Sequence, residues 1–203
     1  MARPRADDYE AKRQLIRERA AELFAEHGFA RTSITDIARA CQCTKSLIYH
    51  YFDSKQAILY DLLAAHMDGL SRTVQDAIRG PGSSRDIFRE VVRAHMRMYA
   101  TARAKHVLLL NELDSLPPRS RAAIVAKERE LVAIVLPLIV AIAPALGRRP
   151  DVRMPAAMAF YGLINWTYTW YRPDGAMSPQ GFADLASDIL LDGLSAALSR
   201  NPA

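Results

Sequence analysis

The chain has 203 residues, half of them hydrophobic, and it carries 27 Lys and Arg against 22 Asp and Glu. This length fits one large domain or a small domain joined to a larger one, and the hydrophobic content excludes a disordered chain. The formal net charge of +5 permits an anionic partner. Residues 1–60 nevertheless hold ten basic against eight acidic side chains, so nucleic-acid binding has to be argued from individual groups and not from bulk charge.

We expect a cytoplasmic protein that does not enter a membrane. Residues 1–9 are charged and lack the apolar core of a signal peptide. The most apolar run, residues 131–146, is shorter than a membrane span and contains two prolines. The two cysteines, Cys41 and Cys43, are poorly spaced for a structural disulfide and too few for a structural zinc site. We expect no metal; small buried hydrophobes and a redox switch both remain open for this pair.

No part of the sequence shows the sustained alternation and hairpin turns of β-strands, so the predicted fold is all-α. Glycine and proline clusters separate the predicted helices. These helices cover residues 8–27, 33–41, 44–51, 54–78, 85–103, 106–115, 119–146, 152–171 and 179–199.

The first predicted helix carries one apolar stripe. Ile16, Ala20, Leu23 and Phe24 follow an i, i+4, i+7, i+8 spacing, which places them on one face of a helix. Gly28 then ends the helix as a C-cap residue. This helix is expected to support the two short helices that follow it.

Residues 33–51 predict two short helices joined by a tight turn. Ser33 and Asp36 have the spacing of a capping box at the start of the first helix. In the second helix, Leu47 and Ile48 can anchor the backbone to its neighbours. Such a pair forms a helix-turn-helix, whose second helix is narrow enough to enter the major groove of DNA.

Polar side chains make the second short helix the candidate recognition helix. Lys45, Ser46, Tyr49 and His50 are long or polar enough to reach outward, and the helix N-terminus adds N–H donors for a phosphate. Lys55 opens the next helix and can hold another phosphate. The alternatives are packing between helices for Tyr49 and a solvated surface position for Lys45.

The segment from Ile16 to Leu59 resembles the DNA-binding domain of the TetR family of transcriptional repressors. The matches keep one register throughout and comprise Ala20, Leu23, Phe24, Gly28, Phe29, Thr32, Ile34, Asp36, Ile37, Ala38, Tyr49, His50, Tyr51, Phe52, Lys55 and Leu59. The resemblance implies a helical homodimer that binds an operator in double-stranded DNA and holds a ligand pocket in its C-terminal part. The DNA contacts it implies are Thr32, Thr35, Thr44, Lys45, Ser46, Tyr49, His50 and Lys55.

The turn between the two short helices departs from this family. The family usually has Gly where this chain has Gln42, and Gly tolerates the left-handed conformation that such turns often need. Gln held in that conformation costs about 1 kcal/mol. We therefore expect either a strained Gln42 or a slightly re-shaped turn.

The clearest break in the chain is the Gly- and Pro-rich segment 80–84. We divide the chain by function into residues 1–55, a three-helix helix-turn-helix DNA-binding domain, and residues 56–203, a helical ligand-binding and dimerisation domain. Residues 152–171 are apolar or aromatic nearly all round, which indicates burial on more than one face. This helix and the apolar helix 179–199 can pair with their symmetry mates in a four-helix dimer interface. A monomeric core is the alternative.

Three arginines recur every four residues in the predicted helix 85–103. Arg89, Arg93 and Arg97 therefore form one basic ridge, while Met96 and Tyr99 can face the interior. A basic ridge beside an aromatic interior suits a ligand with a phosphorylated head and an acyl tail, because the arginine fork matches phosphate. A solvated face is the alternative for the ridge.

The C-terminal part has a second resemblance, carried by Asn165, Trp166, Trp170, Tyr171 and their neighbours. It is similar to TetR-type repressors of fatty-acid, phenylacetate and sterol degradation, which respond to acyl-coenzyme A thioesters. This resemblance implies an acyl-CoA effector, with phenylacetyl-CoA or a fatty acyl-CoA as examples. Taken with the ridge, the predicted ligand-binding residues are Arg89, Arg93, Met96, Arg97, Tyr99, Tyr161, Asn165 and Trp166.

An enzyme is not expected. The five histidines form no H-E-x-x-H pair, and the sequence has no G-x-S-x-G motif or phosphate loop. A lone helical histidine is interpreted as a surface residue or a satisfied core residue. No cofactor or catalytic residue is predicted. The alternatives to an acyl-CoA-responsive repressor are a drug-responsive repressor of an efflux pump and a DNA-binding protein that senses no ligand.

Overall fold

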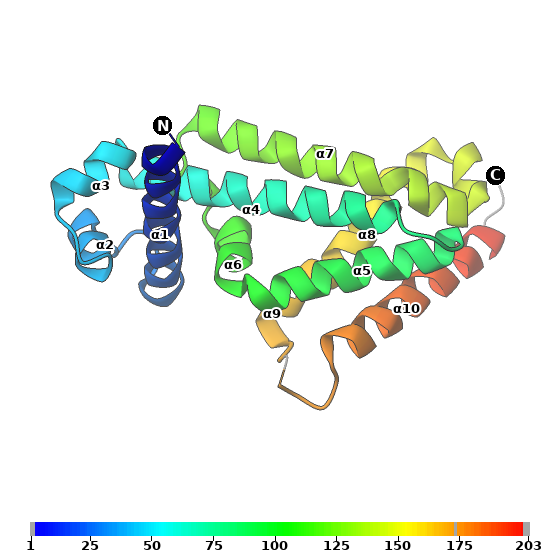
Figure 1. The fold of residues 1–203 in the computed structure, drawn as a ribbon. Helices are drawn as coiled ribbons and strands as arrows, with labels where there is room; N and C mark the ends of the chain where they lie inside the picture. Colours follow the sequence, from blue (N-terminus) through cyan, green and yellow to red (C-terminus); the bar gives the residue numbers. More distant parts are fainter. Residues whose placement is uncertain (1–2, 173, 201–203) are drawn as a thin grey trace. The chain divides into compact units, whose positions relative to one another are not determined.

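The computed structural model describes the backbone of residues 3–172 and 174–200, and the side chains from residue 8 onwards within those ranges. Every regular element in these ranges is helical (Figure 1), which confirms the predicted all-α fold. None of the described helices is both long and apolar enough to span a membrane.

The helices follow the predicted order. They are α1 Arg3–His27, α2 Ile34–Ala40, α3 Lys45–Tyr51, α4 Lys55–Ile78, α5 Ser84–Thr101, α6 Arg103–Asn111, α7 Pro118–Ile142, α8 Pro150–Asn165, α9 Thr167–Trp170 and α10 Pro179–Arg200, with the short 3-10 helices η1 Leu113–Ser115 and η2 Pro144–Arg148.

Three predicted helices end several residues earlier than expected. The helix predicted over 106–115 is observed as α6, which begins at Arg103 and ends at Asn111, before the separate 3-10 helix η1. The helix predicted over 119–146 stops at Ile142, because Ala143 precedes a proline and leaves the α conformation with φ −121° and ψ 76°. The helix predicted over 152–171 is divided between α8 and α9. There the Thr167 hydroxyl donates to the Ile164 carbonyl at 2.6 Å, and such a side-chain bond competes with the regular helical pattern.

The chain forms two compact units. Unit 1 consists of Met1–Met67 and Ala104–Ala126, and unit 2 of Asp68–Arg103 and Lys127–Ala203. Helix α4 contributes to both units, so compactness divides the chain differently from the functional division predicted between residues 55 and 56. That functional boundary stays a prediction.

The core of unit 1 joins α1 to the helix-turn-helix. The predicted stripe of α1 is buried at Ile16, Ala20 and Phe24, and the Phe24 ring packs edge-on against Phe29 with centroids 5.0 Å apart. Ile48 of α3 is completely buried. Burial of a side chain of this size stabilises the fold by roughly 1.5–3 kcal/mol, which holds the short α3 in a fixed orientation.

The core of unit 2 is built on α5, α8 and α10. Phe88 of α5 and Phe160 of α8 are both buried, and their ring centroids lie 5.3 Å apart. Helices α5 and α10 run side by side in Figure 1. Small buried residues of α10, among them Ala183 and Ala186, allow this close packing.

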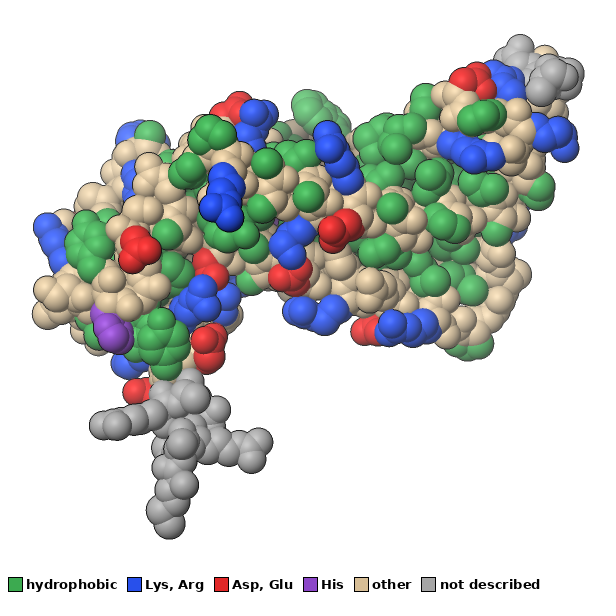
Figure 2. Space-filling view, turned by 90° about the horizontal axis from the view of Figure 1, so that it is seen from above, with side chains coloured by type: hydrophobic (Ala, Val, Ile, Leu, Met, Phe, Trp, Pro, Cys, Tyr) green, Lys and Arg blue, Asp and Glu red, His purple; other side chains and the backbone are tan. Residues whose placement is uncertain are grey.

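Unit 2 also leaves apolar side chains on its surface. Met154 and Met158 of α8 are 52% and 44% exposed, and Leu185 and Ile189 of α10 are 45% and 57% exposed. Each pair is spaced by four residues and so shares one face of its helix. Figure 2 shows hydrophobic side chains gathered in its right-hand part, which belongs to unit 2. Apolar side chains gathered on a surface commonly mark an interaction site.

Candidate functional site

The helix-turn-helix begins with the predicted capping box. The Ser33 hydroxyl accepts a hydrogen bond from the Asp36 N–H at 3.2 Å, and the Ser33 N–H donates to the Asp36 carboxylate at 3.0 Å. The Ser33 hydroxyl also donates to the Asp36 carboxylate at 2.6 Å, and this bond, followed by the bond from the Ser33 N–H, lowers the pKa of Asp36 below its usual value. The reciprocal bonds satisfy N–H groups that α2 would otherwise leave open, and they fix where α2 starts.

The turn keeps the left-handed conformation at its non-glycine residue. Gln42 has a φ of 52°, so this residue adopts the left-handed conformation and carries the strain that a Cβ atom brings there. The N–H of Cys43 then donates to the Ala38 carbonyl at 2.9 Å, closing the turn. Burial raises the pKa of the Cys41 thiol to about 11. A thiol that stays protonated at neutral pH is a poor nucleophile, which favours the packing interpretation of this residue.

Helix α3 has one face inside and one face in solvent. Thr44 caps it by accepting a hydrogen bond from the Leu47 N–H at 3.2 Å, and Ile48 is buried beneath it. The predicted contact residues Lys45, Ser46, Tyr49 and His50 are all exposed. These four side chains therefore present donors and acceptors together, as a recognition helix requires.

The side chains of Thr32 and Lys55 form hydrogen bonds to backbone carbonyls within unit 1. The Thr32 hydroxyl is buried and donates to the Gly28 carbonyl at 2.9 Å. The Lys55 ammonium donates to the carbonyls of Phe29 and Thr32 at 2.6 and 2.8 Å. DNA contact by these two side chains remains a prediction, and it would compete with the internal bonds. Thr35, on α2, is half-buried.

Helix α4 is fastened to α1 by charge. Asp61 accepts from Arg17 at 3.2 Å and also pairs with Arg13, whose guanidinium lies 5.4 Å from the Phe52 ring centroid. These contacts tie α1, the end of α3 and α4 into one body. The recognition helix is therefore held by apolar packing below and by ion pairs beside it.

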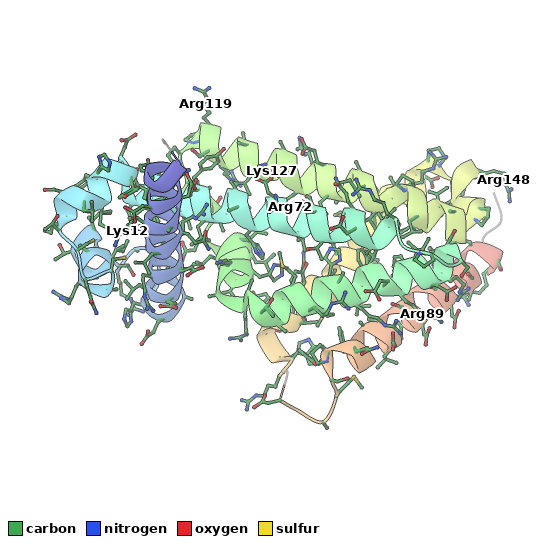
Figure 3. The ribbon with its side chains drawn as sticks, viewed as in Figure 1. Lys12, Arg72, Arg89, Arg119, Lys127 and Arg148 are labelled. Carbon is green, nitrogen blue, oxygen red and sulfur yellow. The ribbon has the colours of Figure 1, made fainter. Side chains whose placement is uncertain are left out.

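The arginine ridge of unit 2 pairs with an acidic ridge on α10. Arg89 donates to Asp188 at 2.7 Å and Arg93 to Asp184 at 2.8 Å, and Figure 3 shows Arg89 reaching from α5 towards α10. As the α5 residue number rises, the α10 residue number falls, so the two helices are antiparallel. Arg97 pairs with Glu90 of its own helix at 2.7 Å and is 60% exposed. Phosphate binding by Arg89 and Arg93 remains a prediction that requires exchange of these carboxylates.

Three predicted effector residues lie in the interior of unit 2, and a fourth, Asn165, is half-buried and hydrogen-bonded to one of them. Met96, Tyr99 and Tyr161 are buried. The Tyr99 hydroxyl donates to Asn165 Oδ1 at 2.7 Å, which joins α5 to α8. Trp166 is 62% exposed and so does not share this interior.

His95 was missed by the sequence analysis. It is completely buried on α5, with its ring edge-on to Tyr99, Phe160 and Tyr161 at centroid distances of 5.9, 5.6 and 5.9 Å. Its spacing from Tyr99 places both on the inner face of α5. That spacing was the available signal, but a lone histidine in a helix has no motif around it.

Two family models match the chain. Residues 16–62 match the model of bacterial regulatory proteins, tetR family, and residues 81–194, more than half of the chain, match that of the tetracyclin repressor-like C-terminal domain. A TetR-family transcriptional regulator from Bordetella parapertussis is 43% identical, with 89% of this chain and 94% of that chain covered and a TM-score of 0.84.

Two further relatives match over nearly their whole length. The HTH-type transcriptional repressor KstR2 of Rhodococcus jostii is 26% identical, with 96% of this chain and 98% of that protein covered. The structure of AibR in complex with isovaleryl coenzyme A and operator DNA is 26% identical, with 89% of this chain and 98% of that chain covered and a TM-score of 0.77.

Proposed function

Because the chain belongs to the TetR family of ligand-responsive transcriptional regulators, we propose that it represses a degradation pathway and leaves its operator when an acyl-CoA thioester binds. Proteins of this family are DNA-binding regulators and not enzymes; they bind operators as dimers and respond to small molecules. The observation that carries the proposal is that the two units have different surfaces and interiors, one suited to DNA and the other to an apolar ligand. Exposed polar residues of α3 stand over a buried Ile48 in unit 1, and unit 2 encloses a separate aromatic interior.

The proposed DNA interface centres on α3. Lys45 and Ser46 lie at the N-terminus of the helix, where backbone N–H groups favour a phosphate, and Tyr49 and His50 follow one turn later. Thr44 precedes them as the N-cap of α3, and Thr35 lies on α2. Thr32 and Lys55 support this surface through their bonds to the loop before α2, and they contact the DNA backbone only if those bonds open.

The proposed dimer interface is the exposed apolar face of α8 and α10. Its side chains include Met154, Met158, Leu185 and Ile189. Burying such side chains against a second copy removes apolar surface from water, and two helices from each copy make a four-helix interface. A two-fold dimer presents two recognition helices, so its operator is an inverted repeat.

The proposed effector is an acyl-CoA thioester whose acyl group enters the interior lined by Met96, Tyr99, Tyr161 and Asn165. AibR, which is similar in fold and sequence, has been crystallised with isovaleryl coenzyme A. Arg97 is the ridge arginine whose side chain is most exposed. It pairs with Glu90 of its own helix, so it can meet a phosphate without breaking an ion pair to α10. Arg89 and Arg93 can do so by exchanging their carboxylates, and Trp166 stands at the exposed end of α8.

Two measurements test the proposal. Selection from a random duplex library identifies the operator, and we expect a pseudo-palindromic site bound by a dimer; a single asymmetric half-site would contradict the DNA part. Thermal-shift measurements with isovaleryl-CoA, phenylacetyl-CoA, long-chain acyl-CoAs and lipophilic cations then test the effector part. We expect stabilisation by thioesters, because a ligand that binds only the folded state raises its stability. Stabilisation by cations alone would favour an efflux regulator.

A further inference from the structure

His95 brings an unpaired hydrogen-bonding atom into the core of unit 2. Its Nδ1 lies 2.8 Å from the Val91 carbonyl oxygen one turn earlier on α5. Its Nε2 is buried and has no hydrogen-bond partner among the residues that the structure describes. Buried polar atoms of proteins are nearly always paired, so this atom calls for an explanation.

The role of Nε2 follows from the partner of Nδ1. A carbonyl oxygen can only accept a hydrogen bond, so Nδ1 carries the proton and donates it. Burial lowers the pKa of His95 to about 4, so the imidazole is neutral at physiological pH. In a neutral imidazole with a protonated Nδ1, Nε2 has a lone pair and no hydrogen. The core of unit 2 therefore contains a hydrogen-bond acceptor that lacks a donor.

The two neighbouring hydroxyl groups already donate elsewhere. The Tyr99 hydroxyl donates to Asn165 Oδ1 at 2.7 Å, and the Tyr161 hydroxyl is directed at the Leu131 carbonyl at 3.4 Å. A phenol has a single proton to donate. The Phe160 ring, which also faces His95, offers no conventional donor. The described aromatic side chains around His95 therefore supply no donor for Nε2, which leaves this acceptor available to a water or to a hydroxyl group of a ligand.

We propose that His95 Nε2 is a specificity-determining site that accepts a hydrogen bond from a neutral hydroxyl group on the apolar part of the effector. This inference rests on the proposed function, since it concerns the acyl group of the same ligand. The surrounding rings require an otherwise apolar or aromatic group. A thioester carbonyl and a carboxylate cannot pair with Nε2, because they contain only hydrogen-bond acceptors and Nε2 needs a donor. An ammonium group is disfavoured because its charge would be buried among aromatic side chains.

The test compares thioesters that differ by one hydroxyl group. The pairs are phenylacetyl-CoA with each of its three ring-hydroxylated forms, and isovaleryl-CoA with 3-hydroxyisovaleryl-CoA. Calorimetry on the full-length protein gives the affinity of each. We expect at least one hydroxylated thioester to bind about tenfold more tightly than its parent, the order of one hydrogen bond to a buried group. His95→Phe removes the acceptor and should bring the ratio close to one.

The control is His66→Phe. His66 is also buried, with a pKa lowered to about 4 by burial, but it lies in unit 1, so this variant should keep the preference for the hydroxylated ligand. His95→Phe should also leave the free protein at least as stable as the parent, because it removes an unsatisfied polar atom. A purely structural role for His95 would instead lower stability and leave the ligand preference unchanged.

A spectroscopic measurement serves if His95→Phe does not fold. In the ¹⁵N-histidine spectrum of the unmodified protein, the His95 Nε2 signal should move upfield with the hydroxylated thioester and stay in place with its parent. Equal affinities within every pair, or an Nε2 signal that none of the hydroxylated ligands moves, would overturn the inference. Operator release by the parent thioesters is measured separately, so the proposed function can stand when this inference fails.

Discussion

Replacing Gln42 with glycine should stabilise the DNA-binding unit. Gln42 holds a φ of 52° in the turn between α2 and α3, where a residue with a Cβ atom is strained by about 1–2 kcal/mol. Glycine removes this strain but loses more backbone freedom on folding, a cost of about 0.5–1 kcal/mol. The net gain is on the order of 0.5–1 kcal/mol, which corresponds to a rise in Tm of about 1–4 °C for a chain of this length.

The matched control is Gln42→Ala. The Gln42 side chain is exposed, so its loss alone should change little, and alanine keeps the Cβ atom that causes the strain. Urea unfolding and thermal unfolding of the three proteins at equal concentration give the comparison. A glycine variant no more stable than the alanine variant would refute the argument, because it would mean that the left-handed turn costs this chain nothing.

Three other predictions follow from the same structure. Lys45→Ala should weaken operator binding and reduce the slope of log affinity against log salt by about 1, measured by fluorescence anisotropy, because one phosphate contact is lost. His66 and His95 stay neutral when folded, with pKa values lowered to about 4. The unfolded chain therefore binds more protons, and the free energy of unfolding should fall by roughly 3 kcal/mol per histidine as the pH drops from 6.5 to 4. Urea unfolding at several pH values should show a weaker pH dependence in His66→Phe and in His95→Phe than in the parent. The same pH dependence in all three proteins would contradict this. Met158→Asp or Ile189→Asp should shift sedimentation from dimer to monomer, and an intact dimer in both would remove α8 and α10 from the interface.

Local patterns predicted most of the fold. The stripe of Ile16, Ala20 and Phe24 identified the inner face of α1, and the capping box of Ser33 and Asp36 identified the start of α2 within a residue. These signals work because caps and helical periodicity act over a few residues. The break near Trp166 was not predicted, because the side-chain bond of the next residue to the α8 backbone leaves no pattern in the apolar spacing.

Partners distant in sequence could not be predicted in the same way. The spacing of Arg89 and Arg93 correctly indicated one ridge, but their carboxylate partners lie on α10, and the antiparallel register of α5 and α10 decides which residues meet. His95 illustrates the same limit. Its position on the inner face follows from helical spacing, whereas the lack of a donor for Nε2 depends on what α8 places around it.

Release of the operator by a thioester tests the central claim most directly. A fluorescently labelled operator duplex, saturated with the protein, is titrated with isovaleryl-CoA, phenylacetyl-CoA, the two free acids and coenzyme A alone. For release, the effector must bind the DNA-free state more tightly than the DNA-bound state. We predict that at least one thioester lowers the anisotropy to that of free DNA, while the acids and coenzyme A do not. Release by the free acids as well, or by none of the compounds, would contradict the account.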